Sequence, residues 1–100
     1  MTTAETLELR PSVAAFAQLM EQTLRHHDQG KGGQPNWRKE TPAWLFGRLQ
    51  YEVAETYLSM HGHHQGMSTR ESRIRSEAVD VANFCMMLVD RVEGLADDDR

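Results

Sequence analysis

The chain has 100 residues, enough for one domain with a modest core and too few for two. Its formal net charge is −4 and its lysines and arginines are scattered, which argues against a nucleic-acid surface, because such a surface needs a basic patch. The single cysteine, Cys85, excludes an internal disulfide and reads as a small buried side chain. No segment has the roughly 18 apolar residues of a membrane span. We therefore expect a cytoplasmic protein that binds neither membrane nor nucleic acid.

Residues 1–100 read as one domain whose ends, 1–10 and 95–100, are expected to fray. Pro11 and Ser12 begin a helical pattern of apolar residues that predicts a first helix as far as about Arg25. The segment 26–40 contains three glycines and a proline and predicts a long loop. Loops of that length in a small domain are more often functional than filler.

A second helix is expected to begin at Thr41 and Pro42, since Thr is a favoured N-cap and Pro suits the first helical position. The segment 61–66, with two glycines, ends this helix. Its acidic residues Glu52 and Glu55 border the predicted apolar face and are expected to be partly buried. The residues of that predicted face are Leu45, Leu49, Val53, Tyr57 and Met60.

The last helix is predicted to begin with a capping box formed by Ser68 and Glu71 and to stop at Gly94. It is apolar on most sides, unlike an ordinary surface helix. Three such helices cannot hide all their apolar surface within one small chain. We therefore predict an all-α fold of three main helices in a bundle that oligomerisation completes, at least as a dimer. The apolar positions of this helix are Ile74, Ala78, Val79, Val81, Cys85, Met86, Leu88, Val89 and Val92.

Polar residues interrupt the last helix at intervals of three, as Glu77, Asp80 and Asn83, and form one stripe. If this stripe faces Glu52 and Glu55 of the preceding helix, four carboxylates converge. At roughly 4 Å and an effective dielectric near 20, each like-charge pair costs on the order of 4 kcal/mol. Mg²⁺ removes that cost, and it prefers carboxylate, water and phosphate oxygens. The pattern predicts Mg²⁺ and, through its open positions, a phosphorylated substrate.

The pairs Glu52-x-x-Glu55 and Glu77-x-x-Asp80 resemble the metal-binding signature of the MazG-like all-α nucleoside triphosphate pyrophosphohydrolases, whose relatives include the dimeric dUTPases. The flanking sequence is similar to a short phage and bacterial branch of that superfamily over about residues 20–92. The flanking stretches that carry the resemblance are His27-Asp28, Lys31-Gly32-Gly33, Trp37 and residues 78–84.

The resemblance implies hydrolysis of a nucleoside triphosphate to the monophosphate and pyrophosphate with Mg²⁺, for which Mn²⁺ can substitute, by a homodimer or homotetramer in a bacterial or infected cell. It makes Glu52, Glu55, Glu77 and Asp80 the metal ligands. Glu52 is also our candidate for deprotonating the attacking water. Many members have a further Glu where this chain has Tyr51, which leaves the number of metals open. The members of the family whose motif layout is most similar to this one act on deoxynucleotides, so the resemblance implies a purine deoxynucleotide substrate such as dGTP or dATP.

Four residues are candidates for binding the substrate: Lys31 for phosphate, Trp37 for the base, Asn83 for sugar or metal-bound water, and His27 in the loop. Trp37 also suits a loop anchor, and Asn83 a buried amide satisfied by backbone. The segment Gly30-Lys31-Gly32-Gly33 is not a P-loop, because the spaced Gly-Lys-Ser/Thr is missing. The sequence leaves open the base, the sugar and the phosphorus attacked.

A different class of function remains open, namely a small non-catalytic oligomerisation or adaptor module. In that case the acids of the last helix pair with arginines of a neighbouring subunit, and the arginines available for this are Arg48, Arg73 and Arg75. A di-iron carboxylate bundle is disfavoured because Glu-x-x-His pairs are absent. His61, His63 and His64 suit either a transition metal or a solvated turn.

Overall fold

A computed structural model describes residues 6–30, 37–62 and 69–95, and within these ranges it contains helices and no strand. The elements are α1 (Pro11–Gly30), the short 3-10 helix η1 (Trp37–Lys39), α2 (Pro42–Met60) and α3 (Arg70–Glu93). The prediction of an all-α fold with three main helices is confirmed. None of these helices combines the length and apolar character that crossing a membrane requires.

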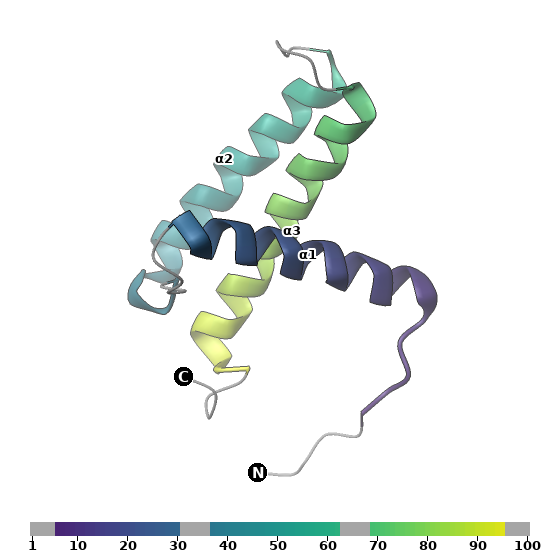
Figure 1. Cartoon of the computed structure of the whole chain (residues 1–100). Coiled ribbons are helices and arrows are strands. Elements are labelled where there is room, and N and C mark those ends of the chain that lie inside the picture. The colour runs from purple at the N-terminus through teal and green to yellow at the C-terminus, as the bar shows by residue number, and fades with distance from the viewer. Residues whose placement is uncertain (1–5, 31–36, 63–68, 96–100) are drawn as a thin grey trace.

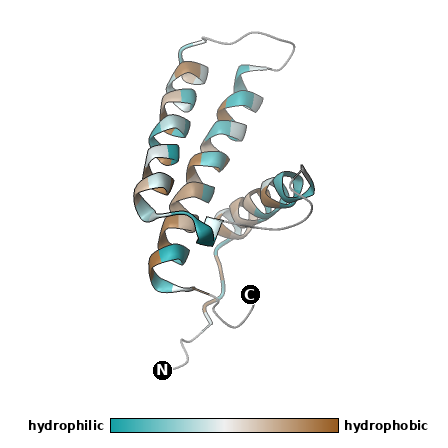
Figure 2. Ribbon diagram, turned by 90° about the vertical axis from the view of Figure 1, so that its left-hand side faces the viewer, coloured by the Kyte–Doolittle hydropathy of each residue, from teal (hydrophilic) through white to brown (hydrophobic). Residues whose placement is uncertain are grey.

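Helices α2 and α3 lie side by side and run in opposite directions, and α1 crosses the pair on one side (Figure 1). The view turned by 90° shows the same α2–α3 pair with α1 leaning against it (Figure 2). Helix α3 contacts α1, η1 and α2. The last helix is therefore the element against which the other segments are placed.

Helix α1 begins at Pro11, as predicted, but it continues to Gly30 instead of ending near Arg25. The apolar pattern stops at Leu24, whereas the backbone stays helical through polar residues, supported at the surface by an ion pair between Glu21 and Arg25, 2.7 Å apart. The prediction of a loop over 26–40 is thus wrong for the last turn of α1 and for η1. As a result, His27 is held by a helix.

The caps of α2 and α3 agree largely with the sequence pattern. The Thr41 hydroxyl accepts a 3.0 Å hydrogen bond from the Trp44 amide, and Pro42 takes the first helical position. Helix α3 is capped by Thr69, one residue after the predicted Ser68, which lies outside the described ranges. Gly94 ends α3 with a φ of 65°, a left-handed conformation that glycine adopts without strain.

The buried stripe of α2 differs from the predicted one. Its buried residues are Leu45, Glu52 and Ser59, which recur every seven residues and so lie on one side of the helix. Val53 and Tyr57, expected in the core, are 50% and 61% exposed. Glu52, which was predicted to border the apolar face, lies in the centre of the buried stripe. The polar side of α2 therefore faces inward at this level of the bundle.

Helix α3 shows the same inversion. Its buried residues are Val79, Asn83 and Asp90, two of them polar. Cys85, predicted to be buried, is exposed, because it lies two residues from Asn83 and so points away from the buried stripe of α3. A single chain thus leaves much apolar surface open to solvent, and the described residues do not show what covers it.

Candidate metal centre and adjoining cleft

Three carboxylates from two helices meet between α2 and α3. Glu52 comes from α2, and Glu77 and Asp80 come from α3, where their separation of three residues places them on one face. One carboxylate oxygen of each residue lies within 4.8 Å of the others. Glu52 is only 8% exposed. The structure therefore brings together three of the four acids singled out in the sequence.

Glu55, the fourth acid, is not part of this group of three. Its charge nevertheless contributes to raising the pKa of both Glu52 and Glu77, so it lies within electrostatic reach of the cluster. Its carboxylate, one turn along α2 from Tyr51, also raises the pKa of that exposed phenol by interacting with its hydroxyl. Glu55 thus has a partner outside the cluster.

Burial raises the pKa of all three cluster carboxyls, and repulsion by neighbouring acids raises it further for Glu52 and Glu77. For Glu52, burial is the main cause, followed by the charges of Asp80 and Glu77, while Arg48 acts in the opposite direction. For Glu77 the causes are burial and then Asp80. For Asp80, burial outweighs the positive charge of His27 and a hydrogen bond with Glu52, which both lower its pKa. The three carboxyls therefore retain protons more readily than three separate acids do. A cation bound there would compete with these protons for the carboxylate oxygens.

A cleft of about 310 Å³ opens directly beside the cluster. Glu52 and Asp80 belong to both, so a ligand in the cleft has access to two of the three carboxylates. The walls come from the C-terminal half of α1, from η1, from the first turns of α2 and from the middle of α3. The lining residues are Thr23, Leu24, His27, Asp28, Trp37, Glu40, Trp44, Leu45, Arg48, Glu52, Asp80, Asn83, Phe84 and Met87.

Asn83 contributes an unsatisfied polar atom to this cleft. The residue is 3% exposed, and its Nδ2 donates a 3.3 Å hydrogen bond to the carbonyl of Met20. Its Oδ1 is buried and has no hydrogen-bond partner among the described residues. Because a carbonyl can only accept, Nδ2 must face Met20, and the remaining oxygen requires a donor. Since Asn83 lines the cleft, a water molecule or a ligand bound there could supply this donor.

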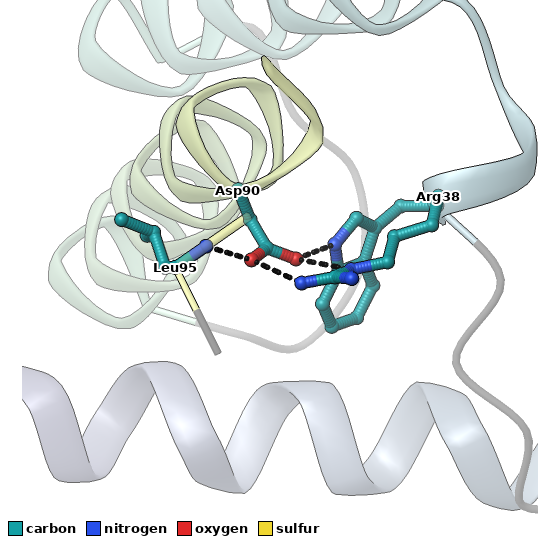
Figure 3. A network of polar contacts seen from close by, with 4 residues as sticks. Arg38, Asp90 and Leu95 are labelled. Carbon is teal, nitrogen blue, oxygen red and sulfur yellow. Dashed lines mark hydrogen bonds and ion pairs between the residues drawn. The ribbon is translucent and has the colours of Figure 1, made fainter. Parts of the chain in front are cut away.

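The wall formed by η1 is fastened to the end of α3 by Asp90, which is 2% exposed (Figure 3). Oδ2 of Asp90 accepts hydrogen bonds from Trp37 Nε1 (2.8 Å) and Arg38 Nε (3.0 Å). Its Oδ1 accepts from Arg38 Nη2 (2.8 Å) and from the Leu95 amide (2.9 Å). Trp37 is therefore a loop anchor and a cleft-lining residue at once.

The remaining sequence candidates fall into three groups. His27 lines the cleft from α1. Lys31, His63 and His64 lie outside the described residues. His61 is exposed at the end of α2 and packs its ring against Tyr57, with the centroids 4.2 Å apart.

Sequence reasoning missed Trp44 as a cleft residue and Asp90 as the residue that fastens η1. It also considered Arg48 only as a partner for a neighbouring subunit. A signal for Arg48 was available, because it precedes Glu52 by four residues and so shares its helix face. Asp90 pairs with residues more than 50 positions away, and no local pattern predicts that contact.

Comparisons with models of known protein families, with curated proteins and with solved structures found no match.

Proposed function

We propose that the protein is a metal-dependent nucleoside triphosphate pyrophosphohydrolase. The observation that carries the proposal is the meeting of Glu52, Glu77 and Asp80 within 4.8 Å at the edge of a cleft with aromatic walls. Carboxylates that share one small site suit a hard divalent cation, and a cleft of this size suits a small ligand. The combination of a hard cation and aromatic walls favours a ligand with phosphates and a base.

The donor set fits Mg²⁺ or Mn²⁺, since three carboxylate oxygens leave coordination positions for water and substrate. The raised pKa values of the three acids and the unsatisfied Oδ1 of Asn83 both support a ligand at this place. When bound, such a cation supplies charge neutralisation at the phosphates and acidifies water. Glu52, Glu77 and Asp80 would hold it.

The side chains around the cluster can divide the remaining work. Glu52, whose pKa is raised, is suited to accept a proton from the attacking water. The rings of Trp37, Trp44 and Phe84 line the cleft and offer surfaces for a nucleobase. We keep a purine deoxynucleotide such as dGTP or dATP as the proposed substrate and a homodimer or homotetramer as the proposed assembly.

Product analysis tests this proposal. The full chain is incubated with each NTP and dNTP in the presence of Mg²⁺ or Mn²⁺, beside the variants Glu52→Gln and Asp80→Asn. Glu93→Gln, a change of the same kind at an exposed position of α3, is the control. We expect monophosphate and pyrophosphate from one or two substrates, with loss in the two cluster variants and none in the control. Absence of turnover with every nucleotide under both metals would reject the enzyme.

One observation favours a second candidate, the oligomerisation or adaptor module. Val53, Tyr57 and Met60 form an exposed apolar side of α2. In this reading, however, the cluster acids need arginines of a neighbour, whereas Arg48 approaches Glu52 within the same chain, at 3.5 Å. Isothermal titration with Mg²⁺ and Mn²⁺ separates the two candidates, because an adaptor has no reason to bind either ion at the cluster.

A further inference from the structure

Arg48 occupies an unusual place in the cleft. It lies on α2, one turn before Glu52, and among the described residues that line the cleft it is the one arginine or lysine. Four acidic side chains line the cleft together with Arg48. They are Asp28, Glu40, Glu52 and Asp80. Among the described residues, an anionic ligand entering this cleft therefore meets one permanent positive charge.

Aromatic rings contact the guanidinium of Arg48 beside the cluster of three carboxylates. Its central carbon lies 4.7 Å from the centroid of the Tyr51 ring and 6.0 Å from that of Phe84. Stacking on a ring face orients a guanidinium while its N–H groups stay available to acceptors. The side chain is therefore partly preorganised to donate hydrogen bonds.

The contact between Arg48 and Glu52 is long for an ion pair. Nη2 lies 3.5 Å from Oε2 of Glu52, beyond the usual range of charge-assisted hydrogen bonds. In addition, this carboxylate belongs to the proposed metal site. A cation bound there would compete with Arg48 for Glu52, so that the guanidinium can change partner at little cost.

The charge balance of the site indicates what the new partner is. Three carboxylates already exceed the charge of one divalent cation, and a triphosphate brings several more negative charges. Phosphate is also the anion whose geometry the guanidinium fork matches best. We propose that Arg48 is a phosphate-binding residue of this cleft, which exchanges Glu52 for an oxygen of the nucleotide's phosphates. This inference rests on the function proposed above.

Pyrophosphate is the probe that tests the role of Arg48, because it carries phosphate without a base. Its dissociation constant is measured by isothermal titration in Mg²⁺ for the full chain and for Arg48→Gln, Arg48→Lys and Arg25→Gln. Arg25 is an exposed arginine of α1 that does not line the cleft, so its variant matches the change in charge. We expect Kd to rise about 10- to 100-fold in Arg48→Gln, since a charged hydrogen bond is lost. The rise is smaller in Arg48→Lys, and Arg25→Gln leaves Kd unchanged.

The affinity for dATP and dGTP, measured from the fluorescence of the two tryptophans, both of which line the cleft, gives a second readout. Arg48→Gln should lower the affinity for both nucleotides by the same factor. Weaker binding of one base together with unchanged binding of pyrophosphate would show that Arg48 reads the base and would overturn the proposal. Circular dichroism verifies the fold, and if Arg48→Gln does not fold, Arg48→Lys decides by its weaker pyrophosphate binding.

The same experiment separates this inference from the proposed function. If the unmodified chain binds neither pyrophosphate nor any nucleotide in the presence of metal, the enzyme itself is rejected. If the unmodified chain binds them and the Arg48 variants bind equally well, the phosphate role of Arg48 is rejected and the enzyme stands.

Discussion

The indole Nε1 of Trp37 donates a 2.8 Å hydrogen bond to Oδ2 of Asp90, a residue 53 positions further along the chain. Arg38, next to the tryptophan, binds both oxygens of the same carboxylate. Through these bonds one wall of the cleft is fixed to the end of α3. The aromatic surface that we propose for the base is therefore positioned by a group outside the cleft.

Replacing Asp90 by Asn should destabilise the protein by roughly 3 kcal/mol, because it removes one partner of a largely buried ion pair and places amide hydrogens against the donors of Trp37 and Arg38. Urea unfolding of Asp90→Asn and of the control Glu93→Gln measures the difference. A loss below about 0.5 kcal/mol, the usual range of surface substitutions, would show that the network adds little stability.

The variant Trp37→Phe separates the two roles of this residue, which fastens η1 to α3 and also lines the cleft. A smaller aromatic ring remains, whereas the Nε1–H donor is lost, so stability should fall by about 1 kcal/mol. If the hydrogen bond also positions the ring, the KM for the nucleotide rises while kcat stays nearly constant. A variant with lower stability but the same KM would leave the network a structural role only.

The three clustered carboxylates should make the stability of the folded chain depend on pH in an unusual direction. Since the pKa values of Glu52, Glu77 and Asp80 are raised in the folded chain, the folded state holds protons that the unfolded state releases. The resulting stabilisation is complete below about pH 4, the ordinary range of these acids, and is lost as the pH rises through their folded-state pKa values.

Thermal unfolding in EDTA between pH 4 and pH 7.5 measures this effect. The loss of stability with rising pH should be steeper for the unmodified chain than for Glu52→Gln, in which one member of the cluster no longer titrates. Mg²⁺ or Mn²⁺ at about 100 times its Kd should restore roughly 2.7 kcal/mol, and more of it near pH 7 than near pH 5, since protons compete for the ligands. Equal slopes in the two proteins would contradict the coupling among the three acids.

The geometry also predicts a ranking among the four acids. Glu77→Gln and Asp80→Asn each remove an oxygen from the group within 4.8 Å, so each should weaken Mn²⁺ binding by at least about tenfold. Glu55 lies outside this group and interacts with Tyr51, so Glu55→Gln should weaken Mn²⁺ binding less. Titration with Mn²⁺ gives the order, and a loss in Glu55→Gln as large as in the others would make Glu55 a direct ligand.

The sequence predicts the helices better than it predicts the faces that they bury. Thr41, Pro42 and Gly94 act through local hydrogen bonds and backbone preferences, so the residues alone indicate where α2 begins and where α3 ends. The end of α1 was predicted five residues too early, because apolar periodicity stops where packing stops and not where the helix stops.

The buried faces were misjudged for a different reason. A prediction from apolar periodicity assigns the apolar residues to the buried face. It therefore places Val53 and Tyr57 in the core and Glu52 at its border. The observed buried faces contain Glu52 on α2 and Asn83 and Asp90 on α3, and the polar groups of all three face residues of other elements. A buried polar site inverts the simple apolar pattern, and such departures are expected where a protein binds something. The spacing of the acids predicted the meeting of Glu52, Glu77 and Asp80 but wrongly included Glu55, and the contacts of Asp90 required the tertiary structure.

The exposed side of α2 gives the last prediction. Val53, Tyr57 and Met60 are each at least 50% exposed on one helix, and a contiguous apolar surface of this kind is costly to leave in water. We expect a second copy of the chain to cover it in solution, so Tyr57→Glu should shift the protein toward the monomer. Sedimentation velocity over a range of concentrations measures this, with Gln50→Glu, at another exposed position of α2, as the control. If both variants and the unmodified chain sediment as monomers at every concentration, the apolar side does not join copies of this chain, and the aromatic cleft and the acidic cluster must work within a single subunit.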